Sequence, residues 1–407
     1  MSEMSYLEKL LDGVKVEWLP LGEITKYEQP TKYLVKAKDY HDTYTIPVLT
    51  AGKTFILGYT NETHGIYQAS KAPVIIFDDF TTANKWVDFD FKAKSSAMKM
   101  VTSCDDNKTL LKYVYYWLNT LPSEFAEGDH KRQWISNYSQ KKIPIPCPGN
   151  PEKSLAIQSE IVRILDKFTA LTAELTAELT AELNMRKKQY NYYRDRLLSF
   201  DEGEVEWKAL GEVGHIVTGR TPKSSDKSAW GDDVDFVTPS DIKNGMRNIT
   251  CPSRRLSAEG AASMPKVRIP RGSLLVTCIG ADMGKTVINA NDCIPNQQIN
   301  AITLSDDSVQ VGYLFHILTA MRETLRRQGE LGGGTMPLIN KSDFSKIVVP
   351  IPSHEEQNRI AKILDKFDTL TNSITEGLPR EIELRQKQYE YYRDLLFSFP
   401  KPETVSN

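Results

Sequence analysis

Apolar residues recur every three or four positions along two long stretches of the chain. One stripe runs through residues 157–183 and the other through residues 360–382, and each consists mainly of isoleucine and leucine with a phenylalanine. This spacing places the apolar side chains on one face of an α-helix. The pattern therefore predicts two long amphipathic helices, which we expect to end near Phe200 and Phe399.

The second stripe contains an interruption that the first lacks. Gly377 and Pro379 stand inside it, and both residue types weaken a helix, so we expect a kink or a break there. The segments 168–189 and 367–388 nevertheless have the same length. Equal lengths favour two helices that lie side by side, antiparallel if the domains they follow stand at opposite ends. Two unrelated surface helices are the alternative.

The sequence ahead of each helical stretch alternates short β-branched runs with turn residues. Such runs favour strands, and the glycines and prolines between them favour turns. We expect a mixed domain in each region, with a twisted, largely antiparallel sheet and one amphipathic helix near its end. The expected strands are 45–49, 72–77, 143–146, 273–278 and 349–352, and the expected helices are Leu110–Leu118 and Val311–Leu325.

The chain repeats itself, and internal repeats decide an architecture before any single element does. Three motifs occur twice. Val16-Glu17-Trp18 recurs 189 residues later as Val205-Glu206-Trp207, while Ile164–Phe168 recurs as Ile363–Phe367 and Tyr192–Asp195 as Tyr391–Asp394, both 199 residues later.

This duplication predicts an α+β protein with two pseudo-repeated mixed α/β recognition domains. Each is followed by a long helix, and we expect the two helices to form an antiparallel coiled pair. The expected divisions are a first recognition domain at 1–150, a first helix at 151–200, a second recognition domain at 201–352, and a second helix with the C-terminal tail at 353–407.

Composition sets mild limits on the function. A chain of 407 residues can bury two or three cores, and its net charge of −2 gives no global sign of nucleic acid binding. The five cysteines form no Cys-x-x-Cys pair, which favours reduced thiols in a cytoplasmic protein over a zinc site. The N-terminal residues do not resemble a signal peptide, and no stretch is apolar for long enough to cross a bilayer.

A second, smaller repeat lies within the first long helix. Thr-Ala-Glu-Leu occurs three times in succession from Thr172 to Leu183. Four helical residues add about 6 Å of length, or roughly one to two base pairs of DNA. We interpret the repeat as an adjustable spacer, although ordinary helix-forming sequence is the simpler alternative. The spacer positions are Thr172, Leu175, Thr176, Leu179, Thr180 and Leu183.

Motifs for catalysis are missing from the sequence. The segment Gly280–Thr286 is one residue too short for a phosphate-binding loop, and we expect Lys285 to meet a phosphate or solvent there. Neither a His-Glu-x-x-His nor a Gly-x-Ser-x-Gly motif occurs. Asp232 and Asp233 are expected in a solvated turn. We therefore predict a protein that binds and holds its partners but has no catalytic or metal-binding residues of its own.

Polar and basic residues in the loops of the two domains are candidates for DNA contact. Lysine and arginine can hold phosphates, whereas serine, threonine, asparagine and aspartate can read base edges. For any one of them an ordinary solvated loop is an equal alternative. The candidates are Thr50, Lys53, Thr81, Thr82, Asn84, Lys85, His130, Lys131 and Arg132 in the first domain, and Arg220, Ser240, Asp241, Lys243, Asn244, Lys285, Gly334 and Thr335 in the second.

Taken together, the chain resembles the specificity subunit of a type I restriction-modification enzyme, in the subclass with Thr-Ala-Glu-Leu spacer repeats (type IC). The resemblance covers essentially the whole chain. It rests on the duplicated Ile-Leu-Asp-Lys-Phe helices, the duplicated Gln-Tyr-x-Tyr-Tyr-Arg-Asp ends and the tandem repeat at Thr172–Leu183.

The resemblance implies two target-recognition domains that each read half of a bipartite, asymmetric site in double-stranded DNA, separated by two conserved helices. It implies that two modification subunits bind S-adenosylmethionine and dock on those helices, and that restriction subunits supply cleavage driven by ATP with Mg. This chain would bind no cofactor and no membrane. Its candidate docking residues are Phe168, Tyr192, Tyr193, Phe367, Tyr391 and Tyr392.

Two alternatives remain open on the sequence. A DNA-modifying or DNA-cleaving enzyme with a fused specificity half would need a cofactor or metal motif outside the repeats, where no room remains. A coiled-coil scaffold could instead clamp two partner proteins without reading DNA. Loss of sequence-specific DNA retention on deletion of either domain would distinguish our interpretation from the scaffold.

Overall fold

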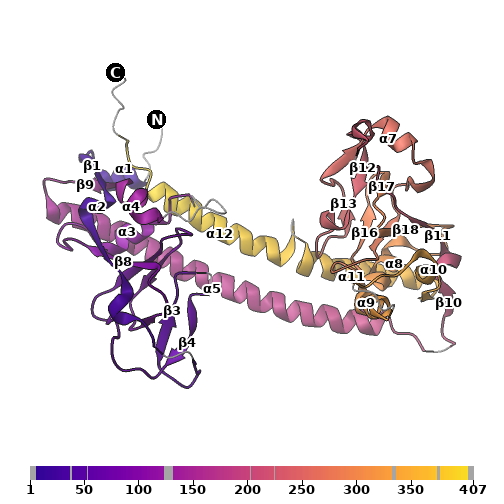
Figure 1. Cartoon of the computed structure of the whole chain (residues 1–407), viewed down its shortest axis with the longest axis horizontal. Coiled ribbons are helices and arrows are strands. Elements are labelled where there is room, and N and C mark those ends of the chain that lie inside the picture. The colour runs from indigo at the N-terminus through magenta and orange to yellow at the C-terminus, as the bar shows by residue number, and fades with distance from the viewer. Residues whose placement is uncertain are drawn as a thin grey trace. The chain divides into compact units, whose positions relative to one another are not determined.

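The computed structural model describes residues 6–36, 39–52, 54–122, 132–201, 203–223, 225–331, 336–373 and 376–401. The chain divides into two compact units, the first made of Met1–Leu175 with Arg385–Asn407 and the second of Thr176–Leu384. Both boundaries fall inside long helices, α5 (Pro151–Leu197) and α12 (Gly377–Leu396), so each unit contains part of both helices (Figure 1).

The first head comprises the elements from β1 to β9, drawn in indigo to purple in Figure 1. Its main sheet has the strand order β2-β8-β5-β6, a smaller sheet has the order β4-β3-β7, and β1 pairs with β9. Every residue of β5 is buried, as its unbroken apolar run predicts. The bounds are α1 Tyr6–Leu11, β1 Val16–Pro20, α2 Leu21–Ile24, β2 Thr25–Glu28, β3 Ile46–Leu49, β4 Ile56–Thr60, β5 Val74–Asp78, β6 Asn84–Val87, β7 Lys92–Ala93, β8 Met98–Ser103, α3 Leu111–Leu118, α4 Gln133–Ser136 and β9 Lys142–Pro146.

The core of the first unit includes residues from both ends of the sequence. Leucines of α1, the aromatic face of α3 and isoleucines at the start of α5 share one buried cluster with the segment that follows α12. The ring of Phe397 lies 5.2 Å from that of Tyr113, centroid to centroid. The indole Nε1 of Trp18 donates a 2.9 Å hydrogen bond to the carbonyl of Pro400. The end of α12 therefore completes the core of the first head.

The second head comprises the elements from β10 to β19, in red to orange in Figure 1. Its sheets have the orders β11-β18-β15-β16-β13 and β14-β12-β17, and β10 pairs with β19. The bounds are β10 Glu206–Ala209, α6 Leu210–Val213, β11 Gly214–Thr218, β12 Trp230–Val237, β13 Asn248–Ile249, β14 Arg254–Leu256, α7 Ala258–Ala262, β15 Leu274–Thr277, β16 Thr286–Asn289, β17 Cys293–Pro295, β18 Ile299–Leu304, α8 Val311–Ala320, α9 Arg322–Glu330, α10 Lys341–Ser345 and β19 Val348–Ile351, followed by α11 His354–Asn372.

The core of the second unit has the same plan as that of the first. Helix α8 packs against α11 and β16, and its buried residues share one cluster with Ile360 and Leu364 of α11. Tyr190 of α5 is also buried in this cluster, where burial raises the pKa of its hydroxyl to about 12. Each unit is therefore a head, the start of the long helix that follows it and the end of the other long helix.

Several predictions about elements are confirmed, and others are wrong. The sheets are antiparallel apart from the pairs β3·β7, β12·β17 and β13·β16 among the described strands. The helix expected at Val311–Leu325 is two helices, because the chain turns at Met321, whose ψ is 2°. Asp233 does not lie in a solvated turn: it belongs to β12, and its carboxylate accepts a 2.8 Å bond from the N–H of Ala258 at the start of α7.

The predicted interruption of the second long helix is confirmed. Helix α11 ends at Asn372, and α12 begins at Gly377. Gly377 has a φ of +75°, and a Cβ there would collide with the carbonyl oxygen of Thr369. Only glycine tolerates both this backbone conformation and the close approach to the Thr369 carbonyl. The glycine at position 377 therefore accounts for the break between α11 and α12.

Candidate DNA-reading and partner-docking surfaces

A buried glutamine holds each head to its own long helix. In the first unit, Gln158 of α5 accepts a 2.9 Å bond from the N–H of Leu110 and donates a 3.0 Å bond to the carbonyl of Lys108. In the second unit, Gln357 of α11 makes the same two bonds, at 2.9 and 3.0 Å, to Gln310 and Ser308. Both glutamines have 0% of their surface exposed. They satisfy backbone groups just ahead of α3 and α8 that would otherwise be unpaired.

A second pair of matched contacts lies two turns further along each helix. Asp166 accepts a 2.5 Å bond from the hydroxyl of Tyr116 and lies 2.9 Å from the Lys112 ammonium. Asp365 is 2.8 Å from Nε2 of His316 and receives two bonds, at 3.0 and 3.1 Å, from Arg247. Burial alone would raise the pKa of Asp365, but the bond to His316 and the charge of Arg247 together lower it.

The head helices are fastened at a third point as well. The hydroxyl of Tyr113 donates to the carbonyl of Pro144 at 2.8 Å, and that of Tyr313 donates to Pro350 at 3.0 Å. The two tyrosines occupy matching places in the two helices that the sequence predicts. The glutamine and aspartate contacts therefore join each head to its long helix, and the tyrosine contact joins α3 to β9 and α8 to β19 within the head.

Aromatic residues gather at matching places in the two units. Phe168 stacks on Tyr392 at a centroid distance of 5.4 Å and an interplanar angle of 7°. Phe367 stacks on Tyr193 at 5.7 Å and 24°. Tyr391 and Tyr192 each contact the neighbouring tyrosine edge to face, and they are themselves 64% and 59% exposed. All six predicted docking residues therefore form two equivalent clusters, and both tyrosines of each cluster are exposed to solvent.

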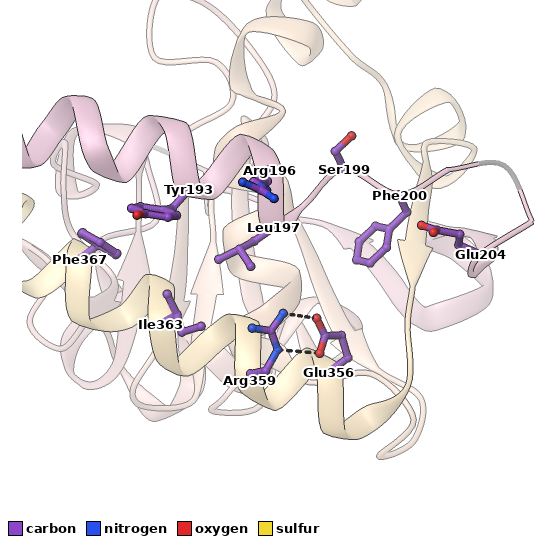
Figure 2. A pocket seen from close by; sticks show the side chains of 10 residues that line it. All are labelled: Tyr193, Arg196, Leu197, Ser199, Phe200, Glu204, Glu356, Arg359, Ile363 and Phe367. Carbon is purple, nitrogen blue, oxygen red and sulfur yellow. Dashed lines mark hydrogen bonds and ion pairs between the residues drawn. The ribbon is translucent and has the colours of Figure 1, made fainter.

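The helix segments in each unit run antiparallel. In the first unit, Thr169 donates a 3.1 Å bond to the hydroxyl of Tyr389, while Phe168 meets Tyr392 further along α12. In the second unit, the lining of one cavity places Tyr193 near Phe367 and Phe200 near the start of α11 (Figure 2).

The candidate DNA contacts of the first head fall into two groups. The hairpin formed by β5 and β6 carries Thr81, Thr82, Asn84 and Lys85. Arg132 precedes α4. Asp79 brings α4 to this hairpin, because its carbonyl and carboxylate accept bonds of 2.9 Å from the N–H groups of Gln133 and Trp134. Thr50 lies apart from them, at the end of β3, and donates to the carbonyl of Thr54.

The hairpin residues differ in their exposure. Thr81 and Lys85 are exposed, whereas Thr82 is buried with a φ of +62° and shapes the turn. Asn84 is half-buried, and its Oδ1 has no hydrogen-bond partner among the described residues. Among the other candidates, Lys53, His130, Lys131, Gly334 and Thr335 lie outside the described residues.

The candidates of the second head mostly come together around one loop. Ser240 and Asp241 form a 3₁₀ turn, Lys243 and Asn244 follow it, and Lys285 reaches the same loop from the segment before β16. Arg220 is tied to them through Pro295, whose carbonyl accepts its N–H at 2.9 Å and which pairs with Val237. The exposed members of this group are Arg220, Ser240, Lys243 and Asn244.

Two candidates of the second head are engaged within the protein. The Lys285 ammonium lies 2.6 Å from the Asp282 carboxylate and donates a 3.1 Å bond to the carbonyl of Ile242. Asp241 accepts bonds from Thr238 and from the N–H of Ser253, and these bonds lower its pKa although burial opposes them. Both side chains shape the loop. We expected Lys285 to meet a phosphate or solvent, but in the structure it pairs with the carboxylate of Asp282.

The spacer repeat lies within the unbroken helix α5. The three leucines Leu175, Leu179 and Leu183 are half-buried and recur every four residues, as do Thr172, Thr176 and Thr180. The hydroxyl of Thr180 donates to the carbonyl of Thr176 at 2.7 Å, which is a bond that threonine makes without leaving the helix.

A cavity of about 630 Å³ opens beside the end of α5 in the second unit (Figure 2). Its walls combine apolar side chains with two arginines and two glutamates. Arg359 and Glu356 form a paired contact in which Nε and one terminal nitrogen donate to the two carboxylate oxygens, at 2.7 and 2.5 Å. The lining residues are Tyr193, Arg196, Leu197, Ser199, Phe200, Glu204, Glu356, Arg359, Ile363 and Phe367.

Three further features limit the chemistry of the described residues. No three His, Cys, Asp or Glu side chains converge among them as metal ligands. Cys278 and Cys293 are buried thiols whose pKa values burial raises to about 12, so neither is a reactive thiolate. Across the described ranges, no helix is both apolar and long enough to cross a membrane.

Residues 14–185 and 202–384 both match the family of type I restriction modification DNA specificity domains, and the chain belongs to this family. It is a specificity subunit of a type I restriction-modification system: a non-catalytic chain that determines which DNA sequence is recognised.

Similar proteins span the whole chain. The specificity subunit of the type I restriction enzyme EcoR124I/EcoR124II from Escherichia coli is 68% identical over 411 aligned positions, covering 100% of both chains. The EcoprrI specificity subunit, also from Escherichia coli, is 36% identical and covers 92% of this chain and 93% of the relative.

Solved structures share the fold. A chain from a study of complex assembly and conformational transition of the type I R-M system has a TM-score of 0.59 at 18% identity, covering 94% of this chain and 97% of that one. The S subunit from M. genitalium has a TM-score of 0.54 at 13% identity, with 98% and 100% covered. The predicted α+β class with two repeated domains is confirmed.

Sequence reasoning missed the residues that fasten the heads to the helices. Gln158 and Gln357 stand at equivalent positions 199 residues apart near the start of the two apolar stripes, and a polar residue repeated there signals a buried hydrogen-bonding role. Arg254, whose guanidinium lies 3.4 Å from the ring centre of Trp230, is a further residue that no sequence motif indicates.

Proposed function

We propose that the chain reads a bipartite, asymmetric site in double-stranded DNA, with one head for each half-site. The observation that carries the proposal is a contrast between framework and loops. The framework contacts of Gln158 and Gln357, and of Tyr113 and Tyr313, are the same in both units. The loops that present the exposed polar residues differ. Two heads held alike but with unlike loops are suited to reading two different half-sites.

The DNA contacts that we propose are the exposed loop side chains. Thr81, Lys85 and Arg132 would serve the first half-site, and Arg220, Ser240, Lys243 and Asn244 the second. Basic members would bind phosphates, while the hydroxyl and amide groups would reach base edges. We retain Thr50, Asn84 and the candidates outside the described residues as secondary choices. Thr82, Asp241 and Lys285 would support the loops from within.

We assign the chain to the subclass with Thr-Ala-Glu-Leu spacer repeats. Residues 1–150 and 201–352 would be the target-recognition domains, with 151–200 and 353–407 as the helices that separate them. The repeat within α5 would set the gap between the half-sites, because each unit adds about one helical turn. Continuous helix through the repeat favours this role, since a length change there is passed on without a joint to absorb it.

Two modification subunits are the partners that we propose, docked on the matched aromatic clusters that contain Tyr192 and Tyr391. They would bind S-adenosylmethionine and methylate one adenine in each half-site, while restriction subunits would use ATP and Mg for cleavage. All of this would take place in the cytoplasm. Large aromatic residues left 59% and 64% exposed favour a protein partner over solvent.

Methylation mapping tests the proposal directly. The full chain would be co-expressed with the modification subunit that serves the 68% identical relative, and N6-methyladenine would be located across the host DNA. We expect a single split motif with a fixed gap, and no methylation from the chain alone or from the modification subunit alone. A stable complex that methylates nothing, or methylates without sequence preference, would favour the protein scaffold instead.

A further inference from the structure

The N-terminal helix covers one end of the helix pair in the first unit. Leu7 and Leu11 of α1 are buried in the same cluster as the start of α5 and the end of α12. At the rim, the hydroxyl of Tyr6 donates a 2.8 Å bond to Glu160 of α5. Under this cover, Leu396 and Phe399 are only 6% and 4% exposed.

The equivalent place in the second unit is the 630 Å³ cavity of Figure 2. The repeat offset of 199 residues relates Leu396 to Leu197 and Phe399 to Phe200, and both counterparts line this cavity. They are half-buried, whereas their equivalents in the first unit are buried. The apolar framework is thus repeated, but the described part of the chain provides no cover for it.

Chain connectivity explains the difference. In the first unit the segment that leads into β1 is a separate helix, α1, which is bonded to Glu160 of α5 and whose leucines share a buried cluster with Leu396 and Phe399. In the second unit the segment that leads into β10 is the end of α5, which is itself the wall of the cavity. The duplication therefore leaves the second unit one helix short, and no described segment of this chain fills the place.

The rim has also changed its charge. Glu160, which accepts the bond from Tyr6, corresponds to Arg359, and Leu395 corresponds to Arg196. The Arg359 guanidinium is already paired with Glu356. Arg196 is exposed at the mouth, with a long 3.3 Å bond to the hydroxyl of Tyr192. A planar guanidinium in this setting favours an incoming carboxylate.

We propose that this cavity receives a short amphipathic helix from one of the two modification subunits, with two leucine-like side chains four residues apart and a carboxylate that meets Arg196. The proposal rests on the function proposed above and names one docking surface within it. The pattern for the occupant is α1 itself, which fills the equivalent place with leucines at positions i and i+4. Because the first unit is already covered, the two modification subunits bind at chemically unequal positions.

Site-specific photo-crosslinking tests the occupant in the purified complex of full-length chains. A benzophenone amino acid would replace Ser199, which is exposed and lines the cavity. The matched control is Ser398, its equivalent in the first unit, where α1 provides the cover. We expect Ser199→benzoylphenylalanine to crosslink a modification subunit within a helix that carries paired leucines and an acidic residue. A crosslink to a second copy of this chain, to a restriction subunit or only within the same chain would overturn the proposal.

A charge reversal gives an independent measurement. Arg196→Glu should weaken binding of one modification subunit by about tenfold, the effect of losing one charge-assisted contact, and leave the other in place. Lys362→Glu is the control, because this exposed residue of α11 does not line the cavity. Native mass spectrometry at graded concentrations would follow the two binding steps. Equal binding by both variants would overturn the docking proposal, while a wild-type complex that still methylates a split motif would leave the proposed function standing.

Discussion

Asp166 and Asp365 occupy the same position of the repeated Ile-Leu-Asp-Lys-Phe motif but meet different partners. Asp166 is held by a tyrosine and a lysine of α3. Asp365 is held by His316 of α8 and by Arg247, which comes from the loop before β13. The repeated aspartate therefore joins the long helix to its head in both units. Its partners differ, but each unit supplies a hydrogen-bond donor and a positively charged side chain.

The anchor at Asp365 predicts a pH dependence of stability in the second unit. Its pKa is lowered in the folded protein, so its contribution is fully present above the ordinary pKa of about 3.9 and is lost as the pH falls through the lower folded value. Asp365→Asn should cost roughly 1–2 kcal/mol at pH 7, because a hydrogen-bonded charged group is replaced by a neutral one that is still partly solvated. Thermal unfolding of wild type and variant from pH 7 to pH 3 would measure the difference.

The change with pH in the stability difference between wild type and Asp365→Asn tests whether the charge of Asp365 is the cause. The difference in unfolding free energy between wild type and Asp365→Asn should narrow as the pH falls below about 4, and it should close once the pH passes the lowered pKa of the folded carboxylate. The neighbouring Asp368 acts in the opposite sense, since burial raises its pKa. Asp368→Asn is therefore the control variant and should not be destabilising at pH 7. A constant gap across the whole pH range would rule out the charge of Asp365 as the cause.

Residue type alone does not separate a DNA contact from a loop support. Lys285 and Lys243 are both lysines in polar loops of the second head, yet Lys285 is bound by Asp282 and the carbonyl of Ile242, while Lys243 is exposed. The difference depends on which groups the fold brings near each ammonium, and sequence spacing does not contain it. The glutamine anchors are more accessible to sequence reasoning, because the repeat places them at equivalent positions 199 residues apart.

At the scale of elements, the sequence predicts a helix break most reliably where a residue's own backbone conformation causes the break. Gly377 marks the break between α11 and α12, because only glycine adopts its φ beside the carbonyl of Thr369. The break between α8 and α9 has no such signal, since Met321 is a good helix former and turns for tertiary reasons. The sequence also does not predict the position of Asp233 in a strand, because its hydrogen-bond partner, the N–H of Ala258, is 25 residues away along the chain.

The glutamine anchor predicts a local loss of stability. Gln357→Leu should destabilise the start of α8 by roughly 1–2 kcal/mol, because the N–H of Gln310 and the carbonyl of Ser308 would both lose their partner in a partly buried place. Hydrogen exchange would show this as faster exchange of the Gln310 amide and of the first turn of α8. The matched variant Gln158→Leu should have the same effect at Leu110 in the first unit and none in the second. Unchanged exchange at Gln310 would mean that the anchor is not needed.

At the scale of the whole molecule, duplication explains why each head behaves as a module. A head, the start of its following helix and the end of the other helix form one compact unit with its own core. The segment that follows α12 contributes Phe397 and Phe399 to the first core, so the first unit consists of two separate stretches of sequence, whereas the second is one continuous stretch. The repeat motifs predict this plan, because they mark the framework and leave the loops free to diverge.

Modularity predicts the result of a head exchange. Replacing residues 18–143 with the corresponding segment of another specificity subunit should change one half of the methylated motif and leave the other half and the gap as they were. Gln158 and Asp166 lie outside the exchanged segment and stay in place, so a new head that presents them with the same backbone and hydroxyl donors should be held in the same orientation. Methylation mapping of the hybrid measures both half-sites at once. A change in both halves would show that the heads do not read independently.

The spacer repeat predicts a change of gap without a change of sequence preference. Deleting Thr176–Leu179 removes about one turn of α5, roughly 6 Å of helix, while the remaining leucines of the repeat keep their four-residue spacing. The mapped motif should then have both half-sites intact and a gap shorter by about one base pair. Replacing the same four residues with other strong helix formers is the control, because it alters composition without altering length. If the deletion leaves the gap unchanged while the complex with the modification subunits still methylates, α5 does not set the distance between the half-sites, and the tandem repeat serves only to form helix.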